Sequence, residues 1–384
     1  MPIGRDDLRR FAVARSLFPP TSLEHALQRF GFVQADPIRA PARAQDLTMR
    51  HRVVDYRAGD LERHYTTLGI EEDFFINYGF VTPDVYALMH PRRMVPAWPS
   101  PGRTRSQRLL AFVRERGEVH PREAQERFAH GRVTNYWGGS SNATTHLLDA
   151  LHYRGLLRVA GRRSGIRVYA PVDRPSTPVG AALSSSNGRP PSSLAAAEVR
   201  ARVDALVDVV VRIYAPLPRP SLATTVGRLR YAVPQWQKEL KAGLRRAYDR
   251  LSRQHVDGVD WFWPADEDPG LAISEESVRM LSPFDPVVWD RRRFELLWGW
   301  AYRFEAYTPA PKRKLGYYAL PVLWRDRVIG WANVSVPRGE VRAELGFVES
   351  GRPSERGFKR ELERELDRMR RFLGETGDRD PGVR

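Results

Sequence analysis

One succession of elements occurs twice in this 384-residue chain, on either side of a segment rich in proline, serine and glycine. Hydrophobic spacing before that segment predicts helices over 106–116, 122–128 and 141–154, followed by two strands joined by a basic turn at 160–165. This order is typical of a winged helix, a relative of the helix-turn-helix. Winged helices also mediate protein–protein contacts, so it is the basic turn that favours nucleic acid.

The second succession lies after the segment and has a less distinct hairpin. It comprises a long helix (194–214), a short helix from Ser221 or Leu222, a third helix (235–251) and a strand (259–263). The segment between the two successions contains the run Ser184-Ser185-Ser186-Asn187-Gly188, which is typical of a flexible linker.

The last third of the chain has a different pattern. Four segments alternate or run apolar between short turns and predict antiparallel strands: 294–307, 316–324, 328–336 and 341–348. A charged amphipathic helix is expected over 354–372. The first hundred residues predict helices over 5–18 and 23–30 and then an aromatic segment, 74–80.

Together these patterns predict an α+β fold class, in which tandem winged-helix domains precede a C-terminal antiparallel β-rich, barrel-like domain. The expected parts are an N-terminal winged-helix-like domain (1–100), a second winged helix (101–174), a flexible linker (175–193), a third winged helix (194–270) and the β-rich domain with its terminal helix (271–384).

The charge balance of the chain is strongly basic. Lys and Arg number 62 against 46 Asp and Glu, which gives a net charge of +16 and an isoelectric point near 10.4. Such a balance favours a polyanionic partner, most often nucleic acid, although an arginine-rich proteome gives the same composition. The absence of cysteine excludes disulfides and cysteine-based zinc sites. No signal peptide or membrane-length apolar run is apparent, so we expect a cytoplasmic, nucleoid-associated protein without a membrane partner.

The stretch from Gly31 to Ile38 looks like a small reaction centre. Gln34 and Asp36 stand two residues apart after an apolar segment, so both side chains point the same way if the backbone is extended. Pro37 restricts Asp36 to extended conformations. A purely structural interpretation is open for each: Asp36 could close an Asx turn beside Pro37, and Gln34 could be a buried amide bonded to the backbone.

Several basic residues are candidates for contacts with DNA phosphates, with a solvated surface as the alternative. Two of the five lysines, Lys312 and Lys314, fall in one proline-bordered loop. Phosphate contacts position a protein on DNA and carry no sequence information. The candidates are Arg39, Arg43, Arg162, Arg163, Lys312, Arg313 and Lys314.

A metal-dependent nuclease is an alternative suggested by His51, Asp55, Asp60, Glu62 and His64. Their spacing matches no metal-ligand motif, and charges on helix surfaces explain them better. We therefore expect neither a metal nor another cofactor.

Two strings in the C-terminal region are distinctive, LSPFDPVVWDR over 281–291 and YTPAPKRKLGYYALP over 307–321. Together with Gln-x-Asp after the second helix and the tandem winged helices, they make the chain resemble the YcaQ/AlkZ winged-helix DNA glycosylases along nearly its whole length. The resemblance implies a C-shaped, basic, monomeric clamp around double-stranded DNA carrying alkylated bases. It also implies that Gln34 and Asp36 are the catalytic pair, in the Gln-x-Asp pattern of the YcaQ branch.

Members of this family excise alkylated purines, including N7-alkylguanine adducts and interstrand cross-links, by hydrolysing the N-glycosidic bond. A base alkylated at N7 is already cationic and leaves as a neutral molecule, so one Asp with a neutral Gln is chemically sufficient. No lysine adjoins the motif, which disfavours a Schiff-base lyase and predicts a monofunctional glycosylase. The alternative is a winged-helix transcriptional regulator that binds DNA without catalysis.

One segment departs from the family pattern. The better-known YcaQ members carry a histidine-containing aromatic segment, Glu-Tyr-Trp-Ala-His, after the catalytic motif, whereas the corresponding residues here, 72–78, include no histidine. We therefore expect the aromatic segment at 72–80 to decide the range of adducts.

Overall fold

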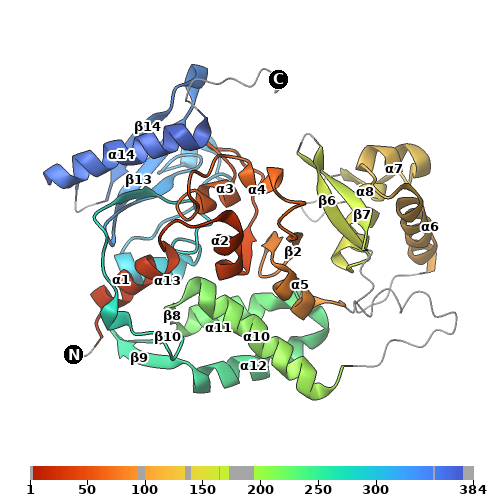
Figure 1. Ribbon diagram of the computed structural model, residues 1–384, viewed down its shortest axis with the longest axis horizontal. Helices are drawn as coiled ribbons and strands as arrows, with labels where there is room; N and C mark the ends of the chain where they lie inside the picture. The colour runs from red at the N-terminus through yellow and green to blue at the C-terminus, as the bar shows by residue number, and fades with distance from the viewer. Residues whose placement is uncertain are drawn as a thin grey trace. The chain divides into compact units, whose positions relative to one another are not determined.

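The computed structural model describes residues 3–92, 100–134, 140–163, 165–172, 194–348 and 351–374 (Figure 1). The chain forms two compact units. Unit 1 comprises residues 1–61, 207–226 and 245–384, and unit 2 comprises 62–206 and 227–244. The predicted linker at 175–193 lies outside the described residues. In the described part of the chain, no helix is long and apolar enough to cross a membrane.

Unit 1 begins with two helices that the sequence predicted. Ser22 caps the second by accepting a hydrogen bond from the N–H of His25 (3.2 Å), and Gly31 ends it in a left-handed conformation with φ 72°. The elements at this end are α1 (Arg5–Ser16), α2 (Leu23–Phe30), β1 (Phe32–Gln34), α3 (Ala44–Met49) and α4 (Asp60–Arg63), the last of which runs into unit 2.

The second part of unit 1 is a small antiparallel sheet with its helices. The predicted strand at 259–263 is confirmed as β10, and it pairs with β9 across a turn at Asp257–Gly258, where φ is positive at both residues. The sheet order is β8-β10-β9. Its elements are α10 (Ala196–Tyr214), β8 (Leu217–Pro218), α11 (Arg219–Arg228), α12 (Gln237–Arg250), β9 (Ser252–Val256) and β10 (Val259–Trp263), and α10 and α12 both begin in unit 2.

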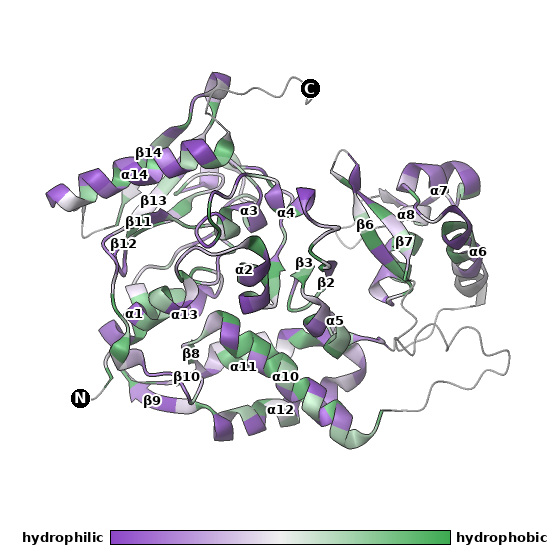
Figure 2. Cartoon of the chain, viewed as in Figure 1, coloured by the Kyte–Doolittle hydropathy of each residue, from purple (hydrophilic) through white to green (hydrophobic). Residues whose placement is uncertain are grey.

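The C-terminal part of unit 1 is a four-stranded antiparallel sheet in the order β11-β12-β13-β14. The expected barrel does not close within the described residues. The strands are β11 (Val278–Met280), β12 (Leu320–Trp324), β13 (Arg327–Ser335) and β14 (Arg342–Phe347), and α14 (Arg356–Leu373) packs on β11. Figure 2 shows apolar and polar residues interleaved along α14, as expected of the amphipathic helix predicted there.

The strand predicted over 294–307 is wrong. Residues Arg291–Trp298 form α13, which Asp290 caps by accepting a hydrogen bond from the N–H of Arg293 (2.9 Å). Phe294 and Leu297 lie three residues apart on its buried face, and Gly299 (φ 70°) ends the helix. The alternation that suggested a strand is therefore one face of a short helix followed by coil.

Unit 2 contains the predicted order of helices and a hairpin over 104–173. Its elements are β2 (Glu71–Phe74), β3 (Tyr78–Val81), α5 (Pro83–Met89), α6 (Ser100–Arg116), α7 (Pro121–Phe128), β4 (Arg132–Thr134), β5 (Ser140–Asn142), α8 (Ala143–Tyr153), β6 (Leu157–Arg163) and β7 (Ile166–Pro171). The aromatic segment at 72–80 folds as the β2–β3 hairpin. A core of Leu109, Val113, Leu148, Leu157 and Tyr169 joins the helices α6 and α8 to the β6–β7 hairpin.

Short 3-10 turns connect these elements in both units. They are η1 (Leu229–Tyr231), η2 (Pro234–Trp236), η3 (Pro269–Leu271), η4 (Ala310–Lys312) and η5 (Pro337–Gly339).

Candidate active site

Gln34 and Asp36 lie at the edge of the core of unit 1. Phe32 and Val33 of β1 are buried, and they fix the segment that carries both polar side chains. Gln34 is 7% exposed and Asp36 9% exposed. Both side chains are therefore held in place by packing and yet reach the surface in part.

The carboxylate of Asp36 is fixed through one of its two oxygens. Oδ1 accepts a hydrogen bond from the N–H of Ile38 (3.0 Å), which is the Asx turn considered for this position. The N–H of Asp36 donates to Oε1 of the buried Gln45 (3.3 Å). Burial raises the pKa of Asp36, and the hydrogen bond from Ile38 opposes this. Within the described residues no donor reaches Oδ2, so this oxygen can meet water or substrate.

The amide of Gln34 is held by a tryptophan far away in the sequence. The indole N–H of Trp289 donates to Oε1 of Gln34 at 2.7 Å. The Trp289 ring packs against Tyr214 with ring centroids 5.0 Å apart. The amide is thus bonded to a side chain and not, as the structural interpretation expected, to the backbone.

Aromatic residues from the C-terminal strings gather around Phe304. The centroid of its ring lies 5.2 Å from those of Phe284 and Tyr318 and 6.0 Å from that of Tyr307. Tyr318 is buried, whereas Tyr307 is 79% exposed. Burial first, and the negative charge of Asp36 second, raise the pKa of both tyrosines. One buried tyrosine, Tyr318, and one exposed tyrosine, Tyr307, are therefore close enough to the Asp36 carboxylate for its charge to act on them.

The carboxylate of Glu305 holds the backbone at the end of the basic loop at 312–314. Oε2 of Glu305 accepts hydrogen bonds from the N–H groups of Lys314 and Leu315, both at 2.8 Å. A cavity of about 510 Å³ lies beside the loop, and its lining includes Trp300, Arg303, Phe304, Glu305, Lys312 and Lys314. Lys312 and Lys314 are exposed, whereas Arg313 donates to the carbonyl of Thr308 (2.8 Å) and stacks on Tyr317.

The other candidate cations differ in how far they reach solvent. Arg39 is exposed, but Arg43 is buried, and its charge acts on the interior carboxylate of Asp46. In unit 2, Arg163 is exposed, with Glu118 and Glu123 both at 3.6 Å. Arg162 in the same hairpin donates to Oε2 of Glu72 at 2.6 Å.

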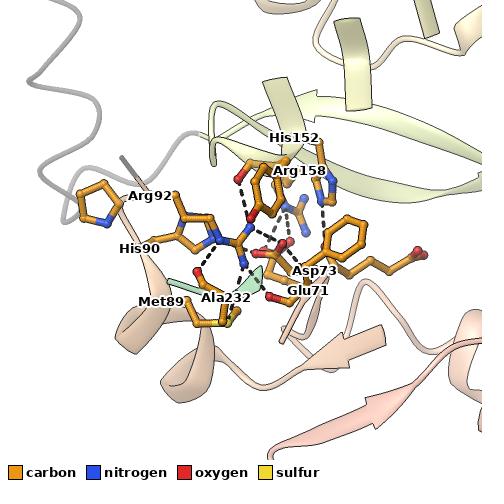
Figure 3. A network of polar contacts seen from close by, with 12 residues as sticks. Glu71, Asp73, Met89, His90, Arg92, His152, Arg158 and Ala232 are labelled. Carbon is orange, nitrogen blue, oxygen red and sulfur yellow. Dashed lines mark hydrogen bonds and ion pairs between the residues drawn. The ribbon is translucent and has the colours of Figure 1, made fainter. Parts of the chain in front are cut away.

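The acidic residues of the aromatic segment at 72–80 belong to an internal network of unit 2 (Figure 3). Asp73 accepts a hydrogen bond from Arg92 at 2.6 Å and lies 2.7 Å from Nε2 of His90. Nε2 of His152 lies 2.7 Å from the carbonyl of Glu72. Burial alone raises the pKa of Asp73, but the Arg92 guanidinium and His90 outweigh it and hold that pKa well below its usual range.

Although the segment at 72–78 has no histidine, the fold of unit 2 brings two histidines to it. His90 and His152 are both buried, and burial lowers the pKa of each. Arg158 also pairs with Glu71 at 3.2 Å. The charges of this hairpin therefore serve to hold unit 2 together.

Among the residues that suggested a nuclease, His51 has a structural partner. His51 is buried, with Nε2 at 3.0 Å from the carbonyl of Met280, and burial lowers its pKa strongly. Over the ranges that the structure describes, no group of three or more His, Asp or Glu side chains could hold a metal ion.

The family model described as DNA glycosylase AlkZ-like matches residues 27–372. The chain belongs to the AlkZ-like DNA glycosylase family. This confirms the resemblance and makes the AlkZ-like chain a DNA glycosylase, an enzyme of DNA repair whose substrate is DNA. Its fold is similar to that of the Streptomyces sahachiroi DNA glycosylase AlkZ, with a TM-score of 0.60 and 14% sequence identity over 97% of each chain.

Sequence reasoning missed several residues around Asp36 in this AlkZ-like glycosylase. Trp289 and the aromatic residues Phe284, Tyr307 and Tyr318 were not singled out as site residues, and neither was Gln45. Their signal was present, because all but Gln45 stand in the two strings that carried the family resemblance. Only the fold shows that these strings accompany β1 in unit 1.

Proposed function

We propose that this AlkZ-like glycosylase removes alkylated purines, including N7-alkylguanine adducts, from duplex DNA. Asp36 and Gln34 are its catalytic residues. The observation that carries the proposal is the state of Asp36: the carboxylate is partly buried, one oxygen is fixed by Ile38, and Oδ2 is open. A carboxylate in that state can act on a reacting sugar without rearrangement.

The reaction uses Asp36 at the side of the sugar opposite the base. Positive charge develops on the deoxyribose as the bond from C1′ to N9 lengthens, and the ionised carboxylate stabilises it. Water forms the new bond to C1′ and gives its proton to Oδ2 of Asp36. The electron pair of the broken bond stays with the purine and cancels its positive charge, so the base leaves neutral and needs no general acid. Asp36 then returns its proton to solvent.

The same chemistry applies to interstrand cross-links through N7 of guanine, because their leaving group is also cationic. The enzyme acts as a monofunctional hydrolase and as a monomer. The five lysines of the chain stand at 238, 241, 312, 314 and 359, and none adjoins Gln34 or Asp36 in the sequence. A lyase step through a Schiff base would need a lysine at the sugar.

DNA is held by basic side chains outside the catalytic pair. We infer that α6, α7, α8 and the β6–β7 hairpin act as the second winged helix (101–174). We also infer that residues 194–270 act as the third, after a winged-helix-like domain over 1–100. Exposed cations best serve as phosphate contacts, which favours Arg39, Arg163, Lys312 and Lys314. To contact DNA, Arg162 would first have to leave Glu72, and Arg313 the carbonyl of Thr308. Arg43 would have to leave its buried position.

The proposal is tested by incubating methylated duplex DNA with the enzyme and measuring free N7-methylguanine by mass spectrometry. We expect base release that leaves abasic sites, with strand breaks only after alkali treatment. Breaks before alkali would contradict the monofunctional assignment. Protection of one specific sequence without base release would instead indicate a regulator that binds DNA without catalysis.

A further inference from the structure

The contact between Trp289 and Gln34 settles which end of the Gln34 amide is free. An indole N–H can only donate a hydrogen bond, so the atom that faces it at 2.7 Å has to be the amide oxygen. A turn of the amide by half a rotation would set its NH₂ group against the indole N–H, two donors facing each other. Gln34 is therefore held in one of its two orientations.

The free end of Gln34 is a hydrogen-bond donor. Within the described residues no acceptor lies within hydrogen-bonding distance of Nε2, and this atom is not fully buried. The side chain of Gln34 is mostly buried, but its Nε2 atom keeps some contact with solvent. Two residues on, Asp36 leaves Oδ2 open, which is an acceptor. The pair thus offers one donor and one acceptor.

We propose that Trp289 is a positioning residue that fixes Gln34 as a donor toward an oxygen of the damaged nucleotide. This inference rests on the proposed function. It assigns the attacking water to Asp36 alone, because a side chain that presents N–H groups cannot accept a proton from water. It also assigns to Gln34 the placement of a sugar or phosphate oxygen of the substrate.

The direct test replaces Trp289 with phenylalanine, which keeps an aromatic ring against Tyr214 and removes the N–H. The rate of N7-methylguanine release is measured with enzyme in excess, beside the affinity for the same DNA. We expect the rate to fall about tenfold with unchanged affinity, because Gln34 can now turn its amide. Trp298→Phe is the matched control, since its indole donates to the carbonyl of Asp326 (2.9 Å), and it should keep the wild-type rate.

A double-mutant cycle separates positioning from mere support of the fold. Gln34→Leu should lower the rate by about a hundredfold, the usual effect of removing a donor that acts in the transition state. Adding Trp289→Phe to Gln34→Leu should change nothing more, because Trp289 acts only through Gln34. Losses that multiply in the double variant would overturn the inference and show that Trp289 supports the site in another way.

Gln34→Glu distinguishes donor from acceptor. Glutamate can still accept the indole hydrogen bond, but it presents an oxygen where Gln34 presents NH₂. We expect Gln34→Glu to be as slow as Gln34→Leu, and a rate near wild type would overturn the inference. If the wild-type enzyme releases no alkylated base, the proposed function fails. If it does, and Trp289→Phe keeps its rate, only this inference fails.

Discussion

The guanidinium of Arg52 faces the carboxylate of Asp285 with two parallel contacts, Nη1 to Oδ2 at 2.8 Å and Nη2 to Oδ1 at 2.9 Å. Both side chains are fully buried. Arg52 also donates to the carbonyls of Ser16 and Thr48. One buried ion pair therefore joins the segment after the Gln-x-Asp motif to the distinctive string at 281–291.

Breaking this pair should destabilise unit 1 strongly. Arg52→Met leaves the carboxylate of Asp285 buried without its partner, which should cost about 3–5 kcal/mol of unfolding free energy. Urea unfolding measures the loss. Arg5→Met is the matched control because Arg5 pairs with Asp257 at the surface (2.6 Å), and it should cost at most about 1 kcal/mol. Equal effects of the two variants would contradict the role given to the buried pair.

The network of unit 2 should make stability depend on pH. His90 and His152 have a lowered pKa in the fold, so the unfolded chain binds protons more readily. The contribution of these two histidines to stability is therefore fully present above about pH 6.5, the ordinary pKa of histidine, and is lost as the pH drops below that value. Asp73, with its lowered pKa, extends the loss below about pH 4.

Thermal melting between pH 7.5 and pH 5 checks this dependence. His152→Gln keeps a side chain that can donate to the carbonyl of Glu72 but does not titrate. Its melting temperature should fall less with decreasing pH than that of the wild type. An unchanged pH dependence in this variant would remove His152 from the explanation.

Gly155 should tolerate no side chain. Its φ is +71°, and a Cβ there would lie 2.6 Å from Nδ1 of the buried His90. Gly155→Ala should therefore cost more than the roughly 1 kcal/mol that a left-handed alanine costs alone. Gly117→Ala isolates the backbone cost, because φ is +78° there and nothing lies within 4 Å of its Cβ. Similar melting temperatures of the two variants would contradict the close approach to His90.

Lys312 and Lys314 should contribute to DNA affinity through charge. Each Lys→Ala variant should weaken binding to undamaged duplex DNA and reduce the salt slope of the affinity by about one. Lys359→Ala in α14 removes the same charge from an exposed helix and serves as the control. Fluorescence anisotropy at several salt concentrations measures both quantities. A salt slope that stays at the wild-type value in both loop variants would argue against phosphate contacts there.

Local patterns were enough to predict most elements. Ser22 and Gly31 mark the limits of α2, and the spacing of Leu147, Leu148 and Leu151 indicates α8, because capping and periodicity act over a few residues. The strand expected at 294 failed because a short helix with two buried positions, Phe294 and Leu297, also shows alternating hydrophobicity. The cap at Asp290 was the signal that favoured the helix.

The proposed catalytic pair was chosen from the sequence, but its surroundings could not be predicted from it. Gln34 and Asp36 are two residues apart, whereas Trp289 lies 255 residues from Gln34 along the chain. No periodicity or capping rule reports a contact at that separation, since it depends on how α1, α13 and the C-terminal sheet pack. Likewise, the basic turn predicted a wing, but the pairing of Arg162 with Glu72 appears only in the fold.

The most direct measurement is the rate at which Asp36→Asn releases N7-methylguanine from methylated duplex DNA, with enzyme in excess. The account predicts a loss of at least about a hundredfold with DNA affinity nearly unchanged, because the amide cannot take a proton from water. Asp46→Asn, at a buried carboxylate that bonds Tyr56 and Gly59, controls for folding defects and should retain activity. Release by Asp36→Asn at the wild-type rate would contradict the catalytic role of Asp36.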